Sequence, residues 1–155
     1  MSYHRIFVDG HSMIYGWSEL ECVHRRAPQK AREQLLGLMI QFQDATHIPV
    51  TLVFDGGNRV KPSTEPTSPQ PLELLYSEPG ETADAVIERR VAARERGTTV
   101  LVITNDRVEK LTVEGFGAET MSAESFGDWI GRERQQFSGR LEDIHRRAAK
   151  YRKLQ

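Results

Sequence analysis

Three aspartates follow short apolar runs in this sequence, at positions where carboxylates can do chemistry. Asp9 ends the run IFVD, Asp55 ends LVFD, and Asp106 follows VITN. If these runs are parallel strands of one open sheet, their carboxyl ends meet at the edge where such sheets bind ligands. Clustered carboxylates repel one another unless a cation lies between them. The pattern therefore predicts a metal-binding edge, although each aspartate alone is also typical of a turn or a helix N-cap.

A fourth aspartate lies in a segment with helical spacing. In ETADAVIERRV, Asp84 falls in the first turn, and Ile87 and Val91 follow at i+3 and i+7. This spacing places the three side chains on one stripe that faces the sheet. A carboxylate there is costly unless the helix dipole, hydrogen bonds or a metal compensate it. Glu81, just before the helix, either joins the same cluster or caps the helix.

The predicted ligands are oxygens, with no sulfur and almost no histidine, and they suit a hard cation such as Mg²⁺ or Mn²⁺. Such an ion usually bridges a few carboxylates to substrate phosphates, so phosphodiester hydrolysis is the reaction that fits. The spacing leaves open whether one ion or two is used. Phospho-receiver domains and Asp-x-Asp phosphatases need a second acid after the first strand, whereas Gly10, His11 and Ser12 follow Asp9. No glycine-rich nucleotide loop is present.

Strand and helix patterns alternate along the chain and predict an α/β fold. Apolar periodicity favours helices at 28–46 and 82–96, a shorter one ending near residue 114, and another from Ser122. β-branched and aromatic residues favour strands at 5–8, 50–54, 72–76 and 99–104, with 118–121 as a candidate fifth. We expect a three-layer Rossmann-like sandwich with a mostly parallel sheet of four to five strands and a basic C-terminal helix.

The chain has 155 residues, enough for one domain with its own core. We place this domain at residues 1–137 and a basic helical extension at 138–155, packed on the domain or projecting from it. Residues 1–130 hold 13 Lys+Arg and 19 Asp+Glu, whereas 131–155 hold 8 and 3. A basic end behind an acidic body suits a polyanion contact or a solvated helix. The proline-rich segment 56–71 is predicted to be a flap beside the functional edge.

The chain carries no signal of export or membrane insertion. Its single Cys22 allows no internal disulfide, and no Cys/His cluster has zinc spacing. It has no apolar run of membrane-spanning length and no N-terminus like a signal peptide. We therefore expect a soluble cytoplasmic protein with no membrane or disulfide partner.

Four motifs resemble, in order and spacing, those of NYN domains of the PIN-like nuclease superfamily. They are Phe7-Val8-Asp9-Gly10, Val53-Phe54-Asp55, Glu81-Thr82-Ala83-Asp84 and Thr104-Asn105-Asp106. The chain length, Gly16-Trp17 and Ser122-Ala123 are similar to the bacterial YacP-like subgroup. The resemblance covers nearly the whole chain, and the ETAD segment is its most specific part.

The resemblance implies a metal-dependent endoribonuclease that hydrolyses RNA, in a subgroup whose members associate with ribosomes and cut messenger RNA. Carried over by motif, Asp9, Asp84 and Asp106 are the catalytic and metal-binding acids. Asp55 lines the same edge, and Asn105 contacts a metal-bound water or the scissile phosphate.

This chain departs from the family in its first motif, which usually reads Asp-Gly-Tyr-Asn and here has His11 and Ser12. Ser12 offers a hydroxyl but lacks the second group of an amide, so an RNA- or ribosome-binding module without efficient catalysis stays an alternative. His11 is either a substrate contact or an ordinary surface residue. Candidate RNA-binding cations are Arg59, Lys61, Arg146, Arg147 and Lys150.

Overall fold

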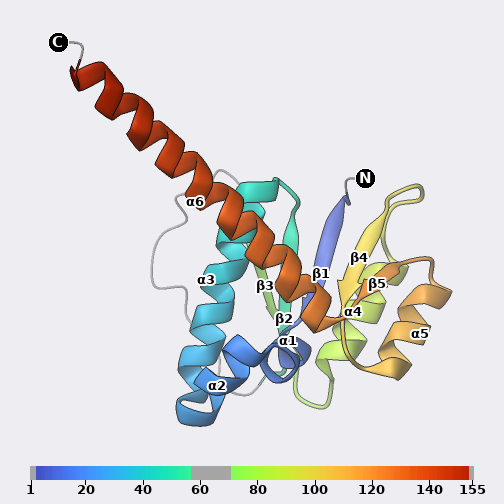
Figure 1. Ribbon diagram of the computed structural model, residues 1–155. Helices are drawn as coiled ribbons and strands as arrows, with labels where there is room; N and C mark the ends of the chain where they lie inside the picture. The colour runs from blue at the N-terminus through green and yellow to red at the C-terminus, as the bar shows by residue number, and fades with distance from the viewer. Residues whose placement is uncertain (1–2, 57–70, 154–155) are drawn as a thin grey trace.

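One parallel sheet organises the chain. The computed structural model describes residues 3–56 and 71–153, and the side chains of all of these except 137–145 and 151–153. The strands lie in the order β3-β2-β1-β4-β5 (Figure 1), and every neighbouring pair is parallel. Their bounds are β1 Arg5–Asp9, β2 Val50–Phe54, β3 Glu73–Tyr76, β4 Val100–Ile103 and β5 Glu119–Met121.

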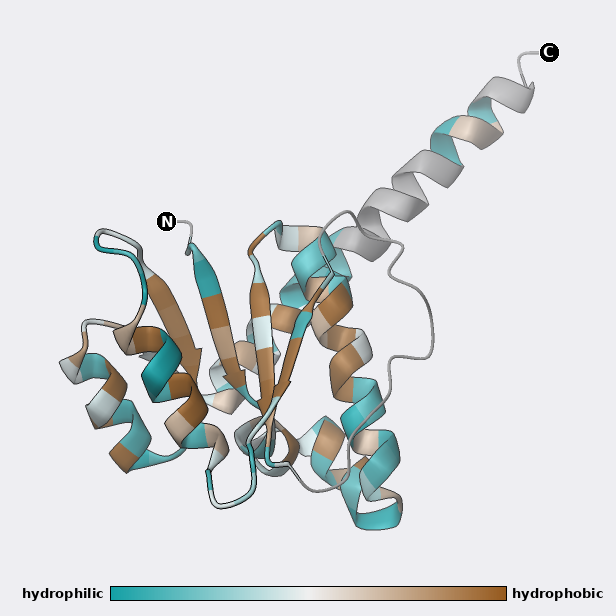
Figure 2. Cartoon of the chain, turned by 180° about the vertical axis from the view of Figure 1, so that it is seen from behind, coloured by the Kyte–Doolittle hydropathy of each residue, from teal (hydrophilic) through white to brown (hydrophobic). Residues whose placement is uncertain are grey.

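Helices cover both faces of this sheet and complete three layers. On one face lie α1 (Gly10–Gly16), α3 (Pro28–Thr46) and the start of α6 (Ala123–Lys153), with α2 (Ser18–Arg26) packed on α1 and α3. On the other face lie α4 (Ala83–Ala92) and α5 (Arg107–Gly115). Seen from behind, the strands between these helices are largely apolar (Figure 2). The expected three-layer α/β sandwich is confirmed, and the described sheet has five strands.

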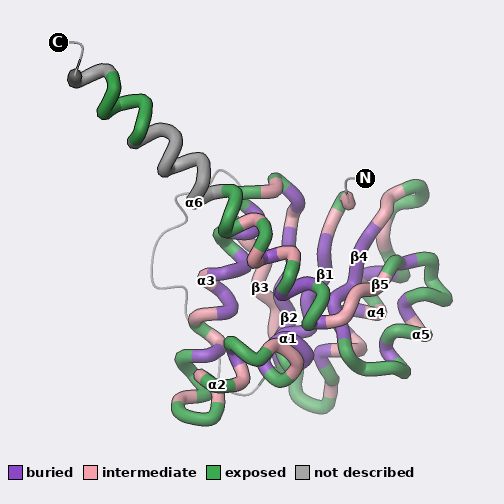
Figure 3. Tube along the Cα trace, viewed as in Figure 1, coloured by how far each residue is buried: buried purple, intermediate pink, exposed green. Residues whose placement is uncertain are grey.

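The alternation of side chains along β1 divides the core into two clusters. Ile6 and Val8 belong to the cluster under α1, α3 and α6, and Phe7 between them belongs to the cluster under α4 and α5. This is the period of two that a strand imposes. Because both faces are covered, β1, β2 and β4 are apolar and buried along nearly their whole length (Figure 3).

The structure differs from the sequence-based expectation in the first connection and in one helix end. Residues 10–26, to which no helix was assigned, form α1 and α2. Both are short, and α1 begins and ends with glycine, so neither shows the long apolar period by which helices are recognised. Helix α4 ends at Ala92 rather than near residue 96, and Gly97, with φ of 85°, lies in the turn before β4.

Helix α6 is a single helix across the expected boundary at residues 137 and 138. Its first turns pack on the sheet through the buried Ala123, Phe126 and Ile130. The helix then continues beyond the body of the domain (Figure 1). Residues 146–150 are exposed, including Arg146, Arg147 and Lys150. The basic end of the chain is therefore helical through Lys153 and projects from the domain.

Three further expectations concern membrane spanning, the single cysteine and the predicted flap. Within the described ranges, none of the helices is both long and apolar enough to cross a membrane. Cys22 is exposed on α2 with a free thiol. The predicted flap at 56–71, with Arg59 and Lys61, lies outside the described residues apart from its two ends.

Candidate metal centre

The order of the strands creates a crevice beside β1. The chain first builds outward from β1 through β2 to β3, then crosses to β4 on the other side of β1. Open α/β sheets bind ligands at such a reversal, beyond the carboxyl ends of the strands. A cavity of about 570 Å³ lies there, lined by Asp9, His11, Ser12, Tyr15, Gly16, Asp55, Thr82, Ala83, Asp84, Asn105, Asp106 and Glu124.

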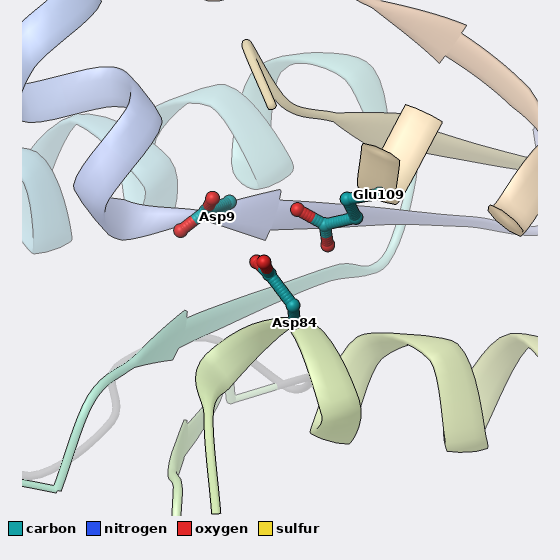
Figure 4. Close-up of side chains that lie close together, drawn as sticks. All are labelled: Asp9, Asp84 and Glu109. Carbon is teal, nitrogen blue, oxygen red and sulfur yellow. The ribbon is translucent and has the colours of Figure 1, made fainter. Parts of the chain in front are cut away.

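Three carboxylates converge at this crevice, and they come from three separate elements. Asp9 ends β1, Asp84 lies in the first turn of α4, and Glu109 lies in the first turn of α5. One oxygen from each lies within 4.8 Å of the others, and the three side chains point toward one another (Figure 4). Asp9 is only 4% exposed and Glu109 only 1%. Asp84 is half-buried, and Asp9 and Asp84 line the cavity whereas Glu109 does not, so the cluster is a largely buried acidic site that meets the cavity through the two aspartates.

Asp9 is held in place by the helix that follows it. The Ser12 hydroxyl donates to Asp9 Oδ2 over 2.9 Å, and the His11 backbone N–H donates to Oδ1 over 3.2 Å. Gly10 permits this tight turn, because a Cβ there would overlap the Phe54 ring. Burial raises the pKa of Asp9, the Ser12 hydrogen bond lowers it, and the negative charge of Asp84 raises it further. The carboxylate is oriented but poorly solvated.

Glu109 lies in an environment that strongly disfavours an ionised carboxylate. The Thr104 hydroxyl donates to Glu109 Oε2 over 2.8 Å, but buried Oε1 has no hydrogen-bond partner among the described residues. Burial raises the pKa of Glu109 to about 9, and the adjacent carboxyls of Asp84 and Asp9 contribute to the rise. A proton or a cation is therefore needed between these carboxylates.

These features fit a divalent cation. The donor set is three carboxylate oxygens, the kind of ligand that Mg²⁺ and Mn²⁺ prefer. Buried Oε1 of Glu109 has no hydrogen-bond donor among the described residues, and either a cation or a proton shared with Asp84 would compensate its burial. A small number of protein ligands also suits Mg²⁺, which keeps several of its waters. The site is therefore a candidate metal centre.

Asp106, predicted as the third metal ligand, lies in the same cavity but has a clear local role. It is the N-cap of α5, where its Oδ1 accepts from the N–H groups of Val108 at 2.8 Å and Glu109 at 3.2 Å. It is not one of the three acids whose oxygens lie within 4.8 Å. Its cap positions the first turn of α5, and with it Glu109. Metal binding by Asp106 stays a prediction.

Asn105 and Asp55 connect the cavity to the neighbouring elements. The Asn105 N–H donates to Ser12 Oγ over 3.0 Å, and its Oδ1 accepts from the Ala123 N–H at the start of α6 over 2.8 Å. Asp55 Oδ1 accepts from the Ala83 N–H at the start of α4 over 3.0 Å. Both side chains therefore line the cavity and also fix helices that form its walls.

The remaining predicted residues lie at the rim or outside. His11 is exposed and lines the cavity. Glu81 forms an ion pair with Arg89 over 2.7 Å and is not in the cavity lining. Arg146, Arg147 and Lys150 are exposed far along α6. The structure thus brings together Asp9, Asp84, Asp106, Asp55, Asn105, Ser12 and His11, and leaves Glu81 and the α6 cations apart.

Glu109 is the site residue that the sequence analysis did not find. In the segment RVEKLTVEG, Val108 and Leu111 look like the buried stripe, yet they are 73% and 61% exposed. The buried residues are Glu109 and Val113, four apart. The available signal was the same as for Asp84: an acid in a first turn, at helical spacing from an apolar residue.

The fold and the acidic centre define an α/β protein with a carboxylate cluster at the point where its strand order reverses. The family model of the YacP-like NYN domain matches residues 6–155, and the chain belongs to this family. It is 31% identical to the uncharacterized protein YacP of Bacillus subtilis (strain 168) over 119 aligned residues. These residues make up 76% of this chain and 69% of that protein.

Two solved structures are similar to the fold described here. The crystal structure of Rae1 (YacP) from Bacillus subtilis has a TM-score of 0.77 and 27% sequence identity, covering 93% of this chain and 82% of that chain. A tryptophan-to-leucine mutant of Rae1 gives the same TM-score and identity, covering 90% and 82%. The predicted resemblance to the YacP-like group and the predicted fold are confirmed.

Proposed function

We propose that this protein is an endoribonuclease that hydrolyses RNA phosphodiester bonds with Mg²⁺ or Mn²⁺ as its cofactor. The observation that carries the proposal is the convergence of Asp9, Asp84 and Glu109 within 4.8 Å at the carboxyl edge of the sheet. Membership of the YacP-like NYN family supports nuclease chemistry. The proposal also includes Asp106 as a fourth acid of the set, because it lines the same cavity.

In this mechanism Asp9, Asp84 and Glu109 would hold the cation, and the walls of the cavity would hold the RNA. When bound, a divalent ion supplies Lewis acidity, which acidifies the attacking water and stabilises the leaving oxygen. The chain's own part is orientation: Ser12 fixes Asp9, Thr104 fixes Glu109, and the start of α4 presents Asp84. These groups are in position before substrate arrives, which lowers the cost of reaching the transition state.

Ser12 supports catalysis over the alternative of a binding module. Its hydroxyl donates to Asp9 Oδ2 and accepts from the Asn105 N–H, so it links the two strand ends that flank the crevice. Asn105 Nδ2 lies 3.4 Å from Glu124 Oε1, and an amide has a second hydrogen that can donate to a phosphate oxygen. The serine therefore still orients the first acid although it replaces the family's asparagine.

We further propose that the substrate is messenger RNA in the cytoplasm and that the protein docks on the ribosome. Exposed Arg146, Arg147 and Lys150 on the projecting end of α6 are suited to phosphates. A helix that extends from the domain can contact an RNA or ribosomal surface while the acidic centre reaches the message. Comparing cleavage of one message naked and on translating ribosomes tests this part: faster cutting on ribosomes supports it, and equal rates contradict it.

The nuclease proposal is tested with a circular RNA, which has no ends and reports internal cuts only. Wild type is compared with Asp84→Asn and with Asp44→Asn, the same substitution at an exposed acid on α3. We expect wild type and Asp44→Asn to linearise the circle with Mg²⁺ or Mn²⁺ and not with chelator. Asp84→Asn should be slower by roughly 100-fold or more, because one ligand oxygen loses its charge.

Two results would overturn the proposal in different ways. Cleavage that survives chelator, or that is equally fast in Asp84→Asn, would remove the metal mechanism. Absence of cleavage by wild type, with RNA binding intact, would leave the binding module as the function.

A further inference from the structure

Two aromatic rings stand beside the carboxylate centre and are not among its three acids. His11 and Tyr15 lie four residues apart on α1, so they share one side of that helix. Their ring centroids are 4.4 Å apart with the planes tilted by 41°, and both residues line the cavity that holds Asp9 and Asp84. Tyr15 is 51% exposed, whereas Met13 and Leu20 of the same region are fully buried.

The Tyr15 ring is fixed although it is exposed. Its hydroxyl hydrogen-bonds to His24 Nε2 over 2.9 Å, and the two rings meet edge to face with centroids 4.8 Å apart. His24 belongs to α2, which packs directly on α1 (Figure 1). The aromatic group of His11, Tyr15 and His24 is therefore assembled before any ligand binds, and ordering it costs little on binding.

The position of the group relative to the acids is also fixed. Gly16 follows Tyr15 and contacts the Asn105 side chain so closely that a Cβ there would overlap it. Asn105 in turn bonds Ser12, which holds Asp9. Contacts therefore run from α1 through Asn105 to the first carboxylate, and the rings keep one position at the mouth of the cavity.

We infer that Tyr15 and His11 form a platform on which an unpaired base of the RNA stacks while the adjoining phosphate lies at the acids. This inference rests on the proposed function and names its substrate class: RNA that is single-stranded at the cut. Aromatic faces accept any base, and removing such a face typically lowers affinity by about 5- to 100-fold per base. A base inside a duplex is stacked on its neighbours and does not offer its face to Tyr15.

A purely structural role for Tyr15 does not account for its exposure. A tyrosine that only held α1 against α2 would gain most by burying its ring. Here the Tyr15 ring contacts the His11 ring and the His24 ring, its hydroxyl bonds His24 Nε2, and half of the residue still remains in solvent beside the acids. The geometry leaves surface for a further planar group.

The experiment measures stacking directly and without cleavage. Short unstructured RNAs carrying 2-aminopurine at each position in turn are titrated with Asp84→Asn protein in Mg²⁺, and with the same protein also bearing Tyr15→Phe or Tyr15→Leu. Fluorescence of 2-aminopurine is quenched when the base stacks. Phe116→Leu is the matched control, because Phe116 is a 47% exposed aromatic that directly follows the last residue of α5. Thermal unfolding of each variant verifies its fold.

We expect quenching at one position with the parent, Tyr15→Phe and Phe116→Leu proteins, and about 5- to 100-fold weaker binding with little quenching for Tyr15→Leu. The same RNA annealed to its complement should bind weakly to all four proteins. Unchanged affinity and quenching in Tyr15→Leu, or equal binding of duplex and single strand by the parent, would overturn the inference.

Cleavage assays separate this inference from the proposed function. With the active protein, Tyr15→Leu should raise KM for single-stranded RNA more than it lowers kcat, and His11→Ala should act in the same direction. If wild type cuts RNA and Tyr15→Leu keeps the wild-type KM, the platform is wrong and the nuclease stands. If 2-aminopurine fluorescence is quenched in a way that depends on Tyr15 but no RNA is cut, the proposed nuclease function is wrong and the stacking platform stands.

Discussion

Glu109 is the residue at which the stability of the fold and the proposed chemistry oppose each other. Its carboxyl is 1% exposed, Oε1 has no partner among the described residues, and Asp84 and Asp9 face it. A group in that position is tolerated as a neutral acid or beside a cation, and disfavoured as a bare carboxylate. A neutral side chain at this position should therefore stabilise the metal-free fold and weaken metal binding.

The pH dependence of stability follows from this conflict. The pKa of Glu109 is raised from 4.5 to about 9 by burial and by the acids beside it. The folded chain thus holds this proton more tightly than the unfolded chain does. The stability that the proton provides is complete below pH 4.5 and is lost as the pH rises toward about 9.

We predict that Glu109→Gln removes most of this dependence in chelator and makes the metal-free protein more stable at about pH 8, by about 1–3 kcal/mol. Urea unfolding of both proteins across this pH range checks the result, with Glu33→Gln on the surface of α3 as control. Mn²⁺ should stabilise wild type and not Glu109→Gln. Parallel pH curves for the two proteins would contradict the account.

Ser12 provides a second prediction at this scale. Ser12→Ala leaves the buried Asp9 Oδ2 and the Asn105 N–H without their shared partner. We expect a loss of about 1–3 kcal/mol in the free energy of unfolding and slower RNA cleavage. Ser18→Ala, which removes an exposed hydroxyl at the start of α2, should cost less than about 0.5 kcal/mol. Equal effects of the two substitutions in chemical denaturation would refute the positioning role.

At the scale of elements, strand ends were easier to predict from the sequence than helix faces. Apolar runs stopping at Asp9 and Asp55 located the carboxyl edge, since a buried parallel strand is nearly continuous in apolar residues. Helix α5 shows the limit of the same reasoning, because Val108 and Leu111 are exposed whereas Glu109 is buried beside Val113. Which face of α5 turns inward is decided by α4 and β5, which it packs against, and not by its own pattern.

The junction of β1 and α1 gives a prediction about an element boundary. At Gly10 a Cβ would overlap the Phe54 ring and approach the Val53 carbonyl, so a side chain forces β1 and β2 apart where Asp9 must be held. Gly10→Ala should cost about 1–3 kcal/mol of stability and slow cleavage. Gly37→Ala is the matched control, because nothing lies within 4 Å of that site in α3 and alanine favours the helix by about 0.5–1 kcal/mol. Equal stabilities by urea denaturation would contradict the tight junction.

At the scale of the whole molecule, the two proposed tasks of RNA binding and RNA cleavage fall on different parts of the chain. The acidic centre lies at the carboxyl edge of the sheet, and the exposed cations Arg146, Arg147 and Lys150 lie on the projecting end of α6. RNA drawn only to the domain would meet the repulsion of residues 1–130, which hold 19 acids against 13 bases. The basic helix offsets this repulsion at a distance, so affinity and cutting should depend on different parts of the chain.

This separation makes the last prediction quantitative. If each of the three cations contacts a phosphate of single-stranded RNA, replacing all three with alanine reduces the slope of log affinity against log salt by about 2. Affinity at low salt falls, while cleavage of a short RNA at saturation stays near the wild-type rate, because the carboxylates are untouched. Arg96→Ala is the control, since that exposed arginine lies in the turn before β4 and not on α6, and it should leave the slope unchanged. An unchanged salt slope in the triple variant would show that α6 is a solvated helix, whereas loss of saturated cleavage would show that the helix shapes the active site itself.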